Sequence, residues 1–170
     1  AAGISAIRTL RSLDQQAQII SVSDEQENPY NKCFLADYLS GDKSEEQTYT
    51  FKQPLIDQLA IDMRYDTKVV AINTHDKHIM LENGSTESYD KLLLATGTRP
   101  LWPKIKNIDS YSNVFAFHNL KSAQGLSSFI KQFCPKNAVV IGAGLSGVEA
   151  ADALTKHAIK VDLVERNPQL

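Results

Sequence analysis

The 170-residue chain is 42% hydrophobic and 22% charged, and its net charge at pH 7 is −2. This composition is typical of a globular protein, and without a basic surplus it indicates neither a nucleic-acid partner nor an anionic membrane surface. No apolar run reaches the length of a membrane span, and two distant cysteines are typical of a reducing cytoplasm. The histidines do not cluster with acids or cysteines at metal-ligand spacing. We therefore expect a cytoplasmic protein without a metal, nucleic-acid or membrane partner.

The N-terminal residues predict a helix, then a strand, then an acid. Apolar residues recur at helical spacing over residues 4–13, and residues 18–23 predict a strand that ends at Asp24 and Glu25. This order follows the first strand of a βαβ nucleotide-binding unit, in which Gly3 would be the third glycine of the fingerprint. We expect the first strand and the first two glycines of that unit to precede residue 1 in the native protein.

The next part of the chain predicts loops and a small antiparallel sheet. Residues 26–50 are polar and are expected to form loops, whereas residues 54–62 predict a short helix with a proline in its first turn. Residues 67–73 and 78–81 predict strands, and the Asn-Gly pair at 83–84 is typical of a hairpin turn. These strands indicate a small antiparallel insertion.

An apolar strand and a linker follow. Residues 91–95 predict a strand that runs into the small residues Thr96 and Gly97. Small residues at the carboxyl end of a strand allow a ligand to approach the backbone. The proline-containing stretch 100–113 predicts a linker, and residues 119–133 predict a helix capped by its first residue, an asparagine.

The most specific pattern lies near the end of the sequence. Apolar residues 138–141 lead into Gly142, Gly144 and Gly147, and a second strand, after a helix-like stretch, ends at Glu165. Strand, G-x-G-x-x-G, helix, strand and acid together are typical of a dinucleotide-binding unit. The first glycine permits the turn, the second lets a pyrophosphate approach the helix N-terminus, and the third lets the helix pack on the strand. The acid favours NADH over NADPH because it would repel a 2′-phosphate, although the arginine after it can pair with a phosphate.

Two nucleotide-binding units with an Ala-Thr-Gly strand end between them resemble the FAD-dependent pyridine nucleotide-disulfide oxidoreductases. The resemblance is strongest to NADH-linked ferredoxin, rubredoxin and nitrite reductase flavoproteins and to apoptosis-inducing factor, and it covers about the first half of such an enzyme. It rests on Gly3, Asp24-Glu25, Pro29–Lys32, Leu35, Tyr89–Gly97 and Gly142–Glu149. It implies an α/β fold with two Rossmann-like units and a small antiparallel β insertion, both units being incomplete here. An FAD-binding domain over 1–108 and the start of an NAD(H)-binding domain over 109–170 are expected.

The resemblance also implies which residues bind each cofactor. FAD would be bound by Gly3, Asp24, Glu25, Lys32, Val69, Ala95, Thr96, Gly97 and Arg99. Asp24 or Glu25 would bind the FAD ribose, and the backbone of Val69 would meet the adenine. NADH would be bound by Gly142, Gly144, Gly147 and Glu165. Glu149, two residues after the third glycine, would act in catalysis by holding the nicotinamide near the flavin.

By the same resemblance, the protein is an enzyme that takes a hydride from NADH onto FAD. It would pass electrons to a small redox protein or a small-molecule acceptor, and the full-length protein would form a homodimer. The flavin supplies the redox chemistry, and the protein supplies positioning and electrostatics.

Two residues depart from the ferredoxin reductase pattern and leave alternatives open. Asp37 stands where a flavin-contacting lysine is usual, and Cys33 stands where a proline is usual. The stretch around Cys33 also resembles the single-cysteine NADH peroxidases, NADH oxidases and CoA-disulfide reductases, in which one cysteine cycles between thiolate and an oxidised form. Lys32 would stabilise that thiolate, but Phe34 stands where a small residue is usual. A third alternative is a non-catalytic, redox-responsive binding flavoprotein.

Overall fold

The computed structural model describes residues 1–168, and the chain divides into two compact units. The first unit comprises Ala1–Pro29 and Thr50–Gly97, and the second comprises Tyr30–Tyr49 and Thr98–Leu170. No helix among residues 1–168 combines the length and the apolar character needed to cross a bilayer.

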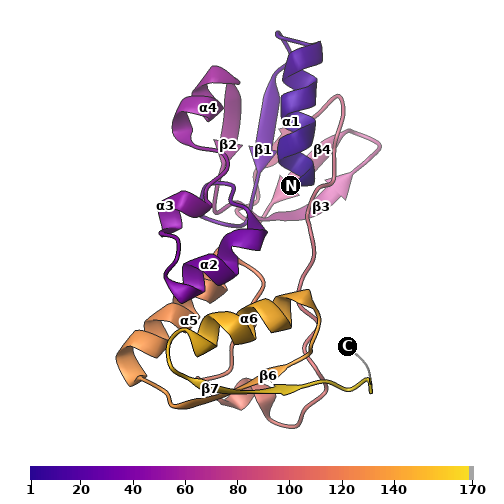
Figure 1. Ribbon diagram of the computed structural model, residues 1–170. Coiled ribbons are helices and arrows are strands. Elements are labelled where there is room, and N and C mark those ends of the chain that lie inside the picture. Colours follow the sequence, from indigo (N-terminus) through magenta and orange to yellow (C-terminus); the bar gives the residue numbers. More distant parts are fainter. Residues whose placement is uncertain (169–170) are drawn as a thin grey trace. The chain divides into compact units, whose positions relative to one another are not determined.

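The first unit combines a helix with a parallel pair of strands (Figure 1). Helix α1 (Ala2–Leu13) is followed by strand β1 (Ile19–Val22), which pairs in parallel with β2 (Ile61–Arg64). The apolar face of α1 packs against both strands and the segment between them. The buried residues of this core are Ile7, Ile19, Phe51, Ile56 and Ile61. The predicted order of helix, strand and acid is therefore confirmed.

The prediction of a helix over residues 54–62 is wrong in its second half. Helix α4 covers Gln53–Gln58, and the chain then enters β2. Ala60 has a φ of 48°, a left-handed conformation that ends the helix and redirects the backbone. Ile61 pairs with Ile19 and is buried, so a long-range partner determines this strand.

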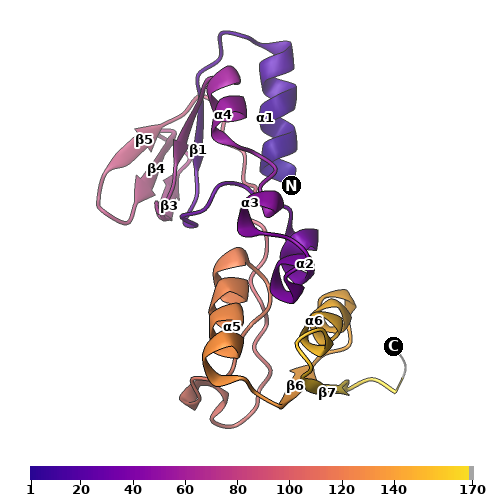
Figure 2. The same cartoon turned by 60° about the vertical axis from the view of Figure 1, so that its left-hand side comes forward.

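The predicted antiparallel insertion is confirmed. Strands β3 (Val69–Asn73), β4 (His78–Leu81) and β5 (Thr86–Ser88) form a sheet in that order (Figure 2). The β4–β5 turn contains Gly84 at a φ of 84°, and the Asn83 side chain accepts a hydrogen bond from the N–H of Ser85 at 3.0 Å.

The predicted strand over residues 91–95 is wrong. None of the described strands pairs with this segment, and Leu93 and Leu94 are 60% and 64% exposed. A strand requires a neighbour for its backbone N–H and C=O groups. The apolar composition that favoured a strand therefore does not suffice here.

The prediction of loops over residues 26–50 is also wrong. The segment contains the 3₁₀ helix η1 (Lys32–Phe34) and helices α2 (Leu35–Ser40) and α3 (Glu45–Thr48). The Asn31 side chain caps η1 by accepting the N–H of Cys33 at 3.0 Å. The helix α2 is stabilised by two leucines four positions apart that are buried in the second unit: Leu35 and Leu39.

The second unit contains the predicted strand–helix–strand. Strand β6 (Asn137–Ile141), helix α6 (Leu145–Thr155) and strand β7 (Lys160–Val164) follow helix α5 (Leu120–Phe133) and the short η2 (Ile108–Ser110). As predicted, an asparagine caps α5, and its side chain accepts the N–H three residues on at 2.9 Å. The strands β6 and β7 pair in parallel, and α5 and α6 cover one face of the pair (Figure 2).

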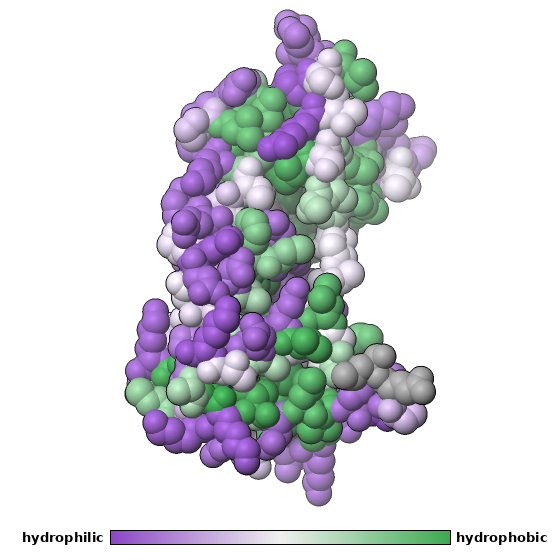
Figure 3. All heavy atoms as spheres, in the orientation of Figure 1, coloured by the Kyte–Doolittle hydropathy of each residue, from purple (hydrophilic) through white to green (hydrophobic). Residues whose placement is uncertain are grey.

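The other face of the β6–β7 pair is open among the described residues. Val139, Ile141 and Val164 are between 50% and 62% exposed there. Hydrophobic residues accordingly show at the surface around α6 and these strands (Figure 3). Parallel sheets are normally covered on both faces. Among the described residues, only the face of this pair toward α5 and α6 is covered.

Candidate dinucleotide-binding sites

The turn between β6 and α6 has the geometry of a phosphate-binding loop. Gly142 has a φ of 100°, which favours glycine, and its N–H donates to the carbonyl of Val164 at 2.8 Å. Gly144 is the N-cap of α6 and accepts the N–H of Gly147 at 2.9 Å. The turn therefore continues the strand ladder and directs the N-terminus of an 11-residue helix outward.

The second and third glycines meet different surroundings. A Cβ on Gly147 would lie 1.9 Å from the carbonyl oxygen of Gly142, so the helix packs on the turn too closely for any side chain. A Cβ on Gly144 would meet no atom within 4 Å. The first N–H groups of a helix lack intrahelical acceptors and carry partial positive charge. The open space at Gly144, next to these donors, fits the pyrophosphate of a dinucleotide.

The acid at the end of β7 is tied to the same turn. Glu165 accepts the N–H of Ala143 through Oε2 at 2.8 Å and the N–H of Asn167 through Oε1 at 2.9 Å. These hydrogen bonds, the one from Ala143 first, lower the pKa of Glu165 below its usual value. The carboxylate is therefore ionised at neutral pH and keeps lone pairs that can accept ribose hydroxyls. The sequence pattern predicted that Glu165 binds the nucleotide but did not indicate its hydrogen bond with Ala143.

Glu149 lies on α6 and is half-buried. It comes two residues after Gly147 and directly before the buried Ala150, so it stands at the border of the core-facing side of the helix. Its contact with the nicotinamide stays a prediction.

Two residues predicted to bind FAD, Gly3 and Ala95, lie close together in the first unit. Gly3 lies in the first turn of α1, and a Cβ placed on it would meet the Cβ of Ala95 at 3.5 Å. Two residues later Gly97 has a φ of 68°. The small residues Ala95 to Gly97 are exposed, so their backbone is accessible to a ligand.

The predicted ribose-binding acids of the first unit, Asp24 and Glu25, lie in a turn beside the residues that lead into β3. The N–H of Thr67 donates to the carbonyl of Ser23 at 2.8 Å, and the N–H of Asp66 donates to the carbonyl of Glu25 at 3.1 Å. These bonds hold the Asp24-Glu25 turn against the residues that lead into β3. Val69, the predicted adenine contact, begins β3 and is 38% exposed.

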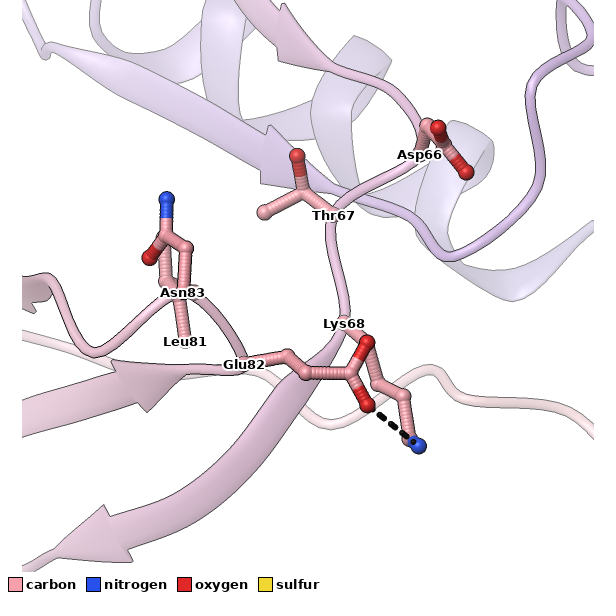
Figure 4. Close-up of a pocket in the computed structure, with 6 residues that line it drawn as sticks. All are labelled: Asp66, Thr67, Lys68, Leu81, Glu82 and Asn83. Carbon is pink, nitrogen blue, oxygen red and sulfur yellow. Dashed lines mark hydrogen bonds and ion pairs between the residues drawn. The ribbon is translucent and has the colours of Figure 1, made fainter.

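A pocket of about 260 Å³ lies at the same place (Figure 4). It is lined by Asp66, Thr67, Lys68, Leu81, Glu82 and Asn83. Figure 4 shows the Lys68 ammonium and the Glu82 carboxylate turned toward each other, with Nζ and Oε1 2.9 Å apart. Of the residues predicted to bind FAD, Asp24, Glu25 and Val69 adjoin the lining residues, which the sequence did not indicate.

The remaining predicted residues belong to the second unit. Lys32 and Cys33 lie on η1 and are exposed, and Arg99 is exposed in the segment that follows Gly97. The predicted FAD set is thus divided between the units, because Gly3, Asp24, Glu25, Val69 and Ala95 to Gly97 belong to the first.

Residues 1–170 match the sequence profile described as pyridine nucleotide-disulphide oxidoreductase. The chain belongs to this family. Family membership confirms the resemblance and implies FAD and NAD(H) as the cofactors. It also agrees with the α/β architecture and with the glycine turn of the second unit.

Three similar proteins illustrate the family. The chain is 32% identical over 169 residues to the NADH-dependent phenylglyoxylate dehydrogenase subunit epsilon of Aromatoleum evansii, covering 99% of this chain and 39% of that protein. The structure of reduced Bacillus anthracis CoADR-RHD superposes with a TM-score of 0.94 at 28% identity, over 99% of this chain and 31% of that chain. The covalent putidaredoxin reductase–putidaredoxin complex gives a TM-score of 0.85 at 28% identity, over 95% and 39%. The chain therefore spans less than half the length of these relatives.

Proposed function

We propose that the complete polypeptide is an FAD-dependent oxidoreductase that accepts a hydride from NADH and passes electrons to a small redox protein. The observation that carries this proposal is the β6–α6 turn, where Gly147 has no room for a side chain and Glu165 is bonded to Ala143. The similar subunit from Aromatoleum evansii is NADH-dependent, and the similar reductase forms a covalent complex with putidaredoxin. These likenesses favour NADH as donor and a small redox protein as acceptor.

Each cofactor would be held by its own residues. The α6 N-terminus and Gly144 would bind the NADH pyrophosphate, Glu165 the adenosine ribose, and Glu149 the nicotinamide. FAD would lie at Gly3, the Asp24-Glu25 turn, Val69, Ala95, Thr96 and Gly97, with Lys32 and Arg99 at its flavin nucleotide. When bound, the flavin accepts the hydride, while the protein binds and orients the two nucleotides.

The domain boundaries, location and assembly belong to the same proposal. We place an FAD-binding domain over residues 1–108 and the start of an NAD(H)-binding domain over 109–170. The protein would act in the cytoplasm, and the full-length polypeptide would form a homodimer.

An anaerobic titration of the full-length protein with NADH tests this proposal. We expect a yellow protein whose flavin absorbance is bleached by about one equivalent of NADH per flavin. NADPH should bleach it only at higher concentration, because the Glu165 carboxylate repels a 2′-phosphate. A colourless protein, or a flavin that excess NADH does not reduce, would contradict the proposal. Slow reduction with a long-lived charge-transfer complex would instead favour a non-catalytic, redox-responsive binding protein.

One observation favours a second candidate, a single-cysteine peroxidase, oxidase or CoA-disulfide reductase. Free cysteines are among the most buried residues, yet Cys33 is exposed. The variant Cys33→Ser separates the two functions. It should leave NADH-driven dye reduction unchanged if the protein is an electron-transfer reductase, and it should abolish turnover of a peroxide or disulfide substrate if the thiol is redox-active.

A further inference from the structure

The segment that carries Lys32 and Cys33 packs on the nucleotide-binding helix of its own unit. Leu39 of α2 is 1% exposed. It lies in one core with Ile130 of α5, with Ala153 and Leu154 of α6, and with Ile159, which directly precedes β7. This core packs α2 against α6.

Two polar contacts join the C-terminal ends of α2 and α6. Lys156 donates from Nζ to Oδ2 of Asp42 at 2.6 Å, and His157 donates from Nε2 to the carbonyl of Leu39 at 2.6 Å. A carbonyl oxygen can only accept, so the imidazole carries its hydrogen on Nε2. The Ser40 hydroxyl donates to the same carboxylate at 2.9 Å and orients it. The hydrogen bond that Lys156 donates to Asp42 lowers the pKa of Asp42, and the same bond raises the pKa of Lys156.

The same segment is fastened to α5 as well. The hydroxyl of Tyr30 accepts the N–H of Leu120 at 3.0 Å, and Oε2 of Glu45 accepts a hydrogen from Gln124 at 2.8 Å. The segment Tyr30–Tyr49 is therefore bonded to α5 and α6 at Tyr30, at Leu39 and Asp42, and at Glu45.

We propose that Lys156 and His157 are positioning residues that, through Asp42 and the Leu39 carbonyl, fix the Lys32–Cys33 turn to the helix that binds the NADH pyrophosphate. This inference rests on the proposed function, in which α6 binds NADH and η1 contacts the flavin nucleotide. Hydride transfer is sensitive to misplacement, since an error of about 1 Å can cost up to about 100-fold in rate. An exposed ion pair adds little to global stability, so breaking this one should displace the turn without unfolding the protein.

The test compares two neutralised carboxylates that face the same lysine. Asp42 lies across the α2–α6 contact, whereas Asp152 lies on α6 itself, with Oδ2 3.9 Å from Nζ of Lys156. In the full-length FAD-loaded protein we expect Asp42→Asn to lower the limiting rate of flavin reduction by NADH about fivefold, with the Kd for NADH and the FAD content unchanged. The variant Asp152→Asn should match the wild type. The exchanged pair Asp42→Lys with Lys156→Asp should recover most of the lost rate.

Amide hydrogen exchange supplies a second readout that needs no turnover. We expect Asp42→Asn to raise exchange at residues 32–40, while Asp152→Asn leaves it unchanged. The inference is overturned if Asp42→Asn matches Asp152→Asn in both measurements, or if the rate falls only together with FAD content and the exchanged pair recovers nothing. If NADH does not reduce the wild-type flavin at all, the proposed function fails. If Asp42→Asn also leaves amide exchange at residues 32–40 unchanged, the positioning role of Lys156 fails as well.

Discussion

The first and second units each place a glycine in the opening turn of a helix, under different constraints. A Cβ on Gly3 of α1 would meet the Cβ of Ala95 at 3.5 Å, which is an ordinary contact. A Cβ on Gly147 of α6 would lie 1.9 Å from a backbone oxygen. The second unit therefore needs its glycine for packing, whereas packing in the first unit would accept a Cβ at Gly3. Two glycines in the opening turns of helices are thus under different packing constraints.

The acids that end β1 and β7 differ in the same way. The carboxylate of Glu165 accepts the backbone N–H of Ala143, so this side chain holds the glycine turn in place. In the first unit the acid-bearing turn is held through backbone bonds to the residues before β3. Substitutions in the glycine turn of the second unit are therefore expected to have the larger effects.

The largest effect is expected from Gly147→Ala. Its Cβ would collide with the Gly142 carbonyl, so the turn or the helix must shift. We expect a loss of about 3 kcal/mol or more in the free energy of unfolding, measured by urea denaturation of the full-length protein. Gly3→Ala is the matched variant and should stay within about 1 kcal/mol of the wild type. Equal stability of the two variants would remove the contrast between the units.

A smaller effect, confined to binding, is expected from Gly144→Ala. The position has a φ of −69° and open space around a Cβ, so the fold should be unchanged. The added methyl group would stand where the pyrophosphate approaches, and we expect the Kd for NADH to rise about tenfold or more, or about 1.4 kcal/mol. Calorimetric titration with NADH measures this, and unaltered affinity would place the pyrophosphate elsewhere.

Glu165→Gln should act more mildly and in a pH-dependent way. Because the folded state lowers the pKa of Glu165, its ionised form stabilises the fold at neutral pH, and this contribution is lost as the pH falls below the usual range of glutamate. Denaturation midpoints at about pH 7 and about pH 3 should therefore differ less in the variant than in the wild type. At neutral pH the Kd for NADH should rise about fivefold, and discrimination against NADPH should weaken. A variant with the wild-type pH dependence would show that the bonds to Ala143 and Asn167 are not formed in solution.

The smallest effect is expected at a glycine without either constraint. Gly125 lies inside α5, and a Cβ there would lie 3.9 Å from the ring of Phe115. Gly125→Ala should raise the free energy of unfolding by about 0.5–1 kcal/mol, because alanine favours a helix interior. Destabilisation instead would mean that the Phe115 contact is tighter than the structure shows.

The sequence predicted what depends on neighbouring residues and failed where a distant partner decides. The β6–α6–β7 unit and the Asn119 cap follow from local patterns and were predicted. Helix α2 was missed because its two leucines are buried by residues about 85 to 120 positions away. Strand β2 needs β1 as its partner, and residues 91–95 were overpredicted because none of the described strands pairs with them.

The same distinction applies to the candidate sites. The three glycines and Glu165 could be named from spacing alone. The bond from Ala143 to Glu165 and the ion pair between Asp42 and Lys156 join residues 22 and 114 positions apart, and no local pattern indicates them.

A crystal structure of the full-length protein with NADH tests the central claim most directly. We predict that the pyrophosphate lies at the α6 N-terminus beside Gly144, within hydrogen-bond distance of the first helical N–H groups, and that Glu165 accepts a hydroxyl of the adenosine ribose. Saturating NADH bound at another place, or absent from this turn, would contradict the account.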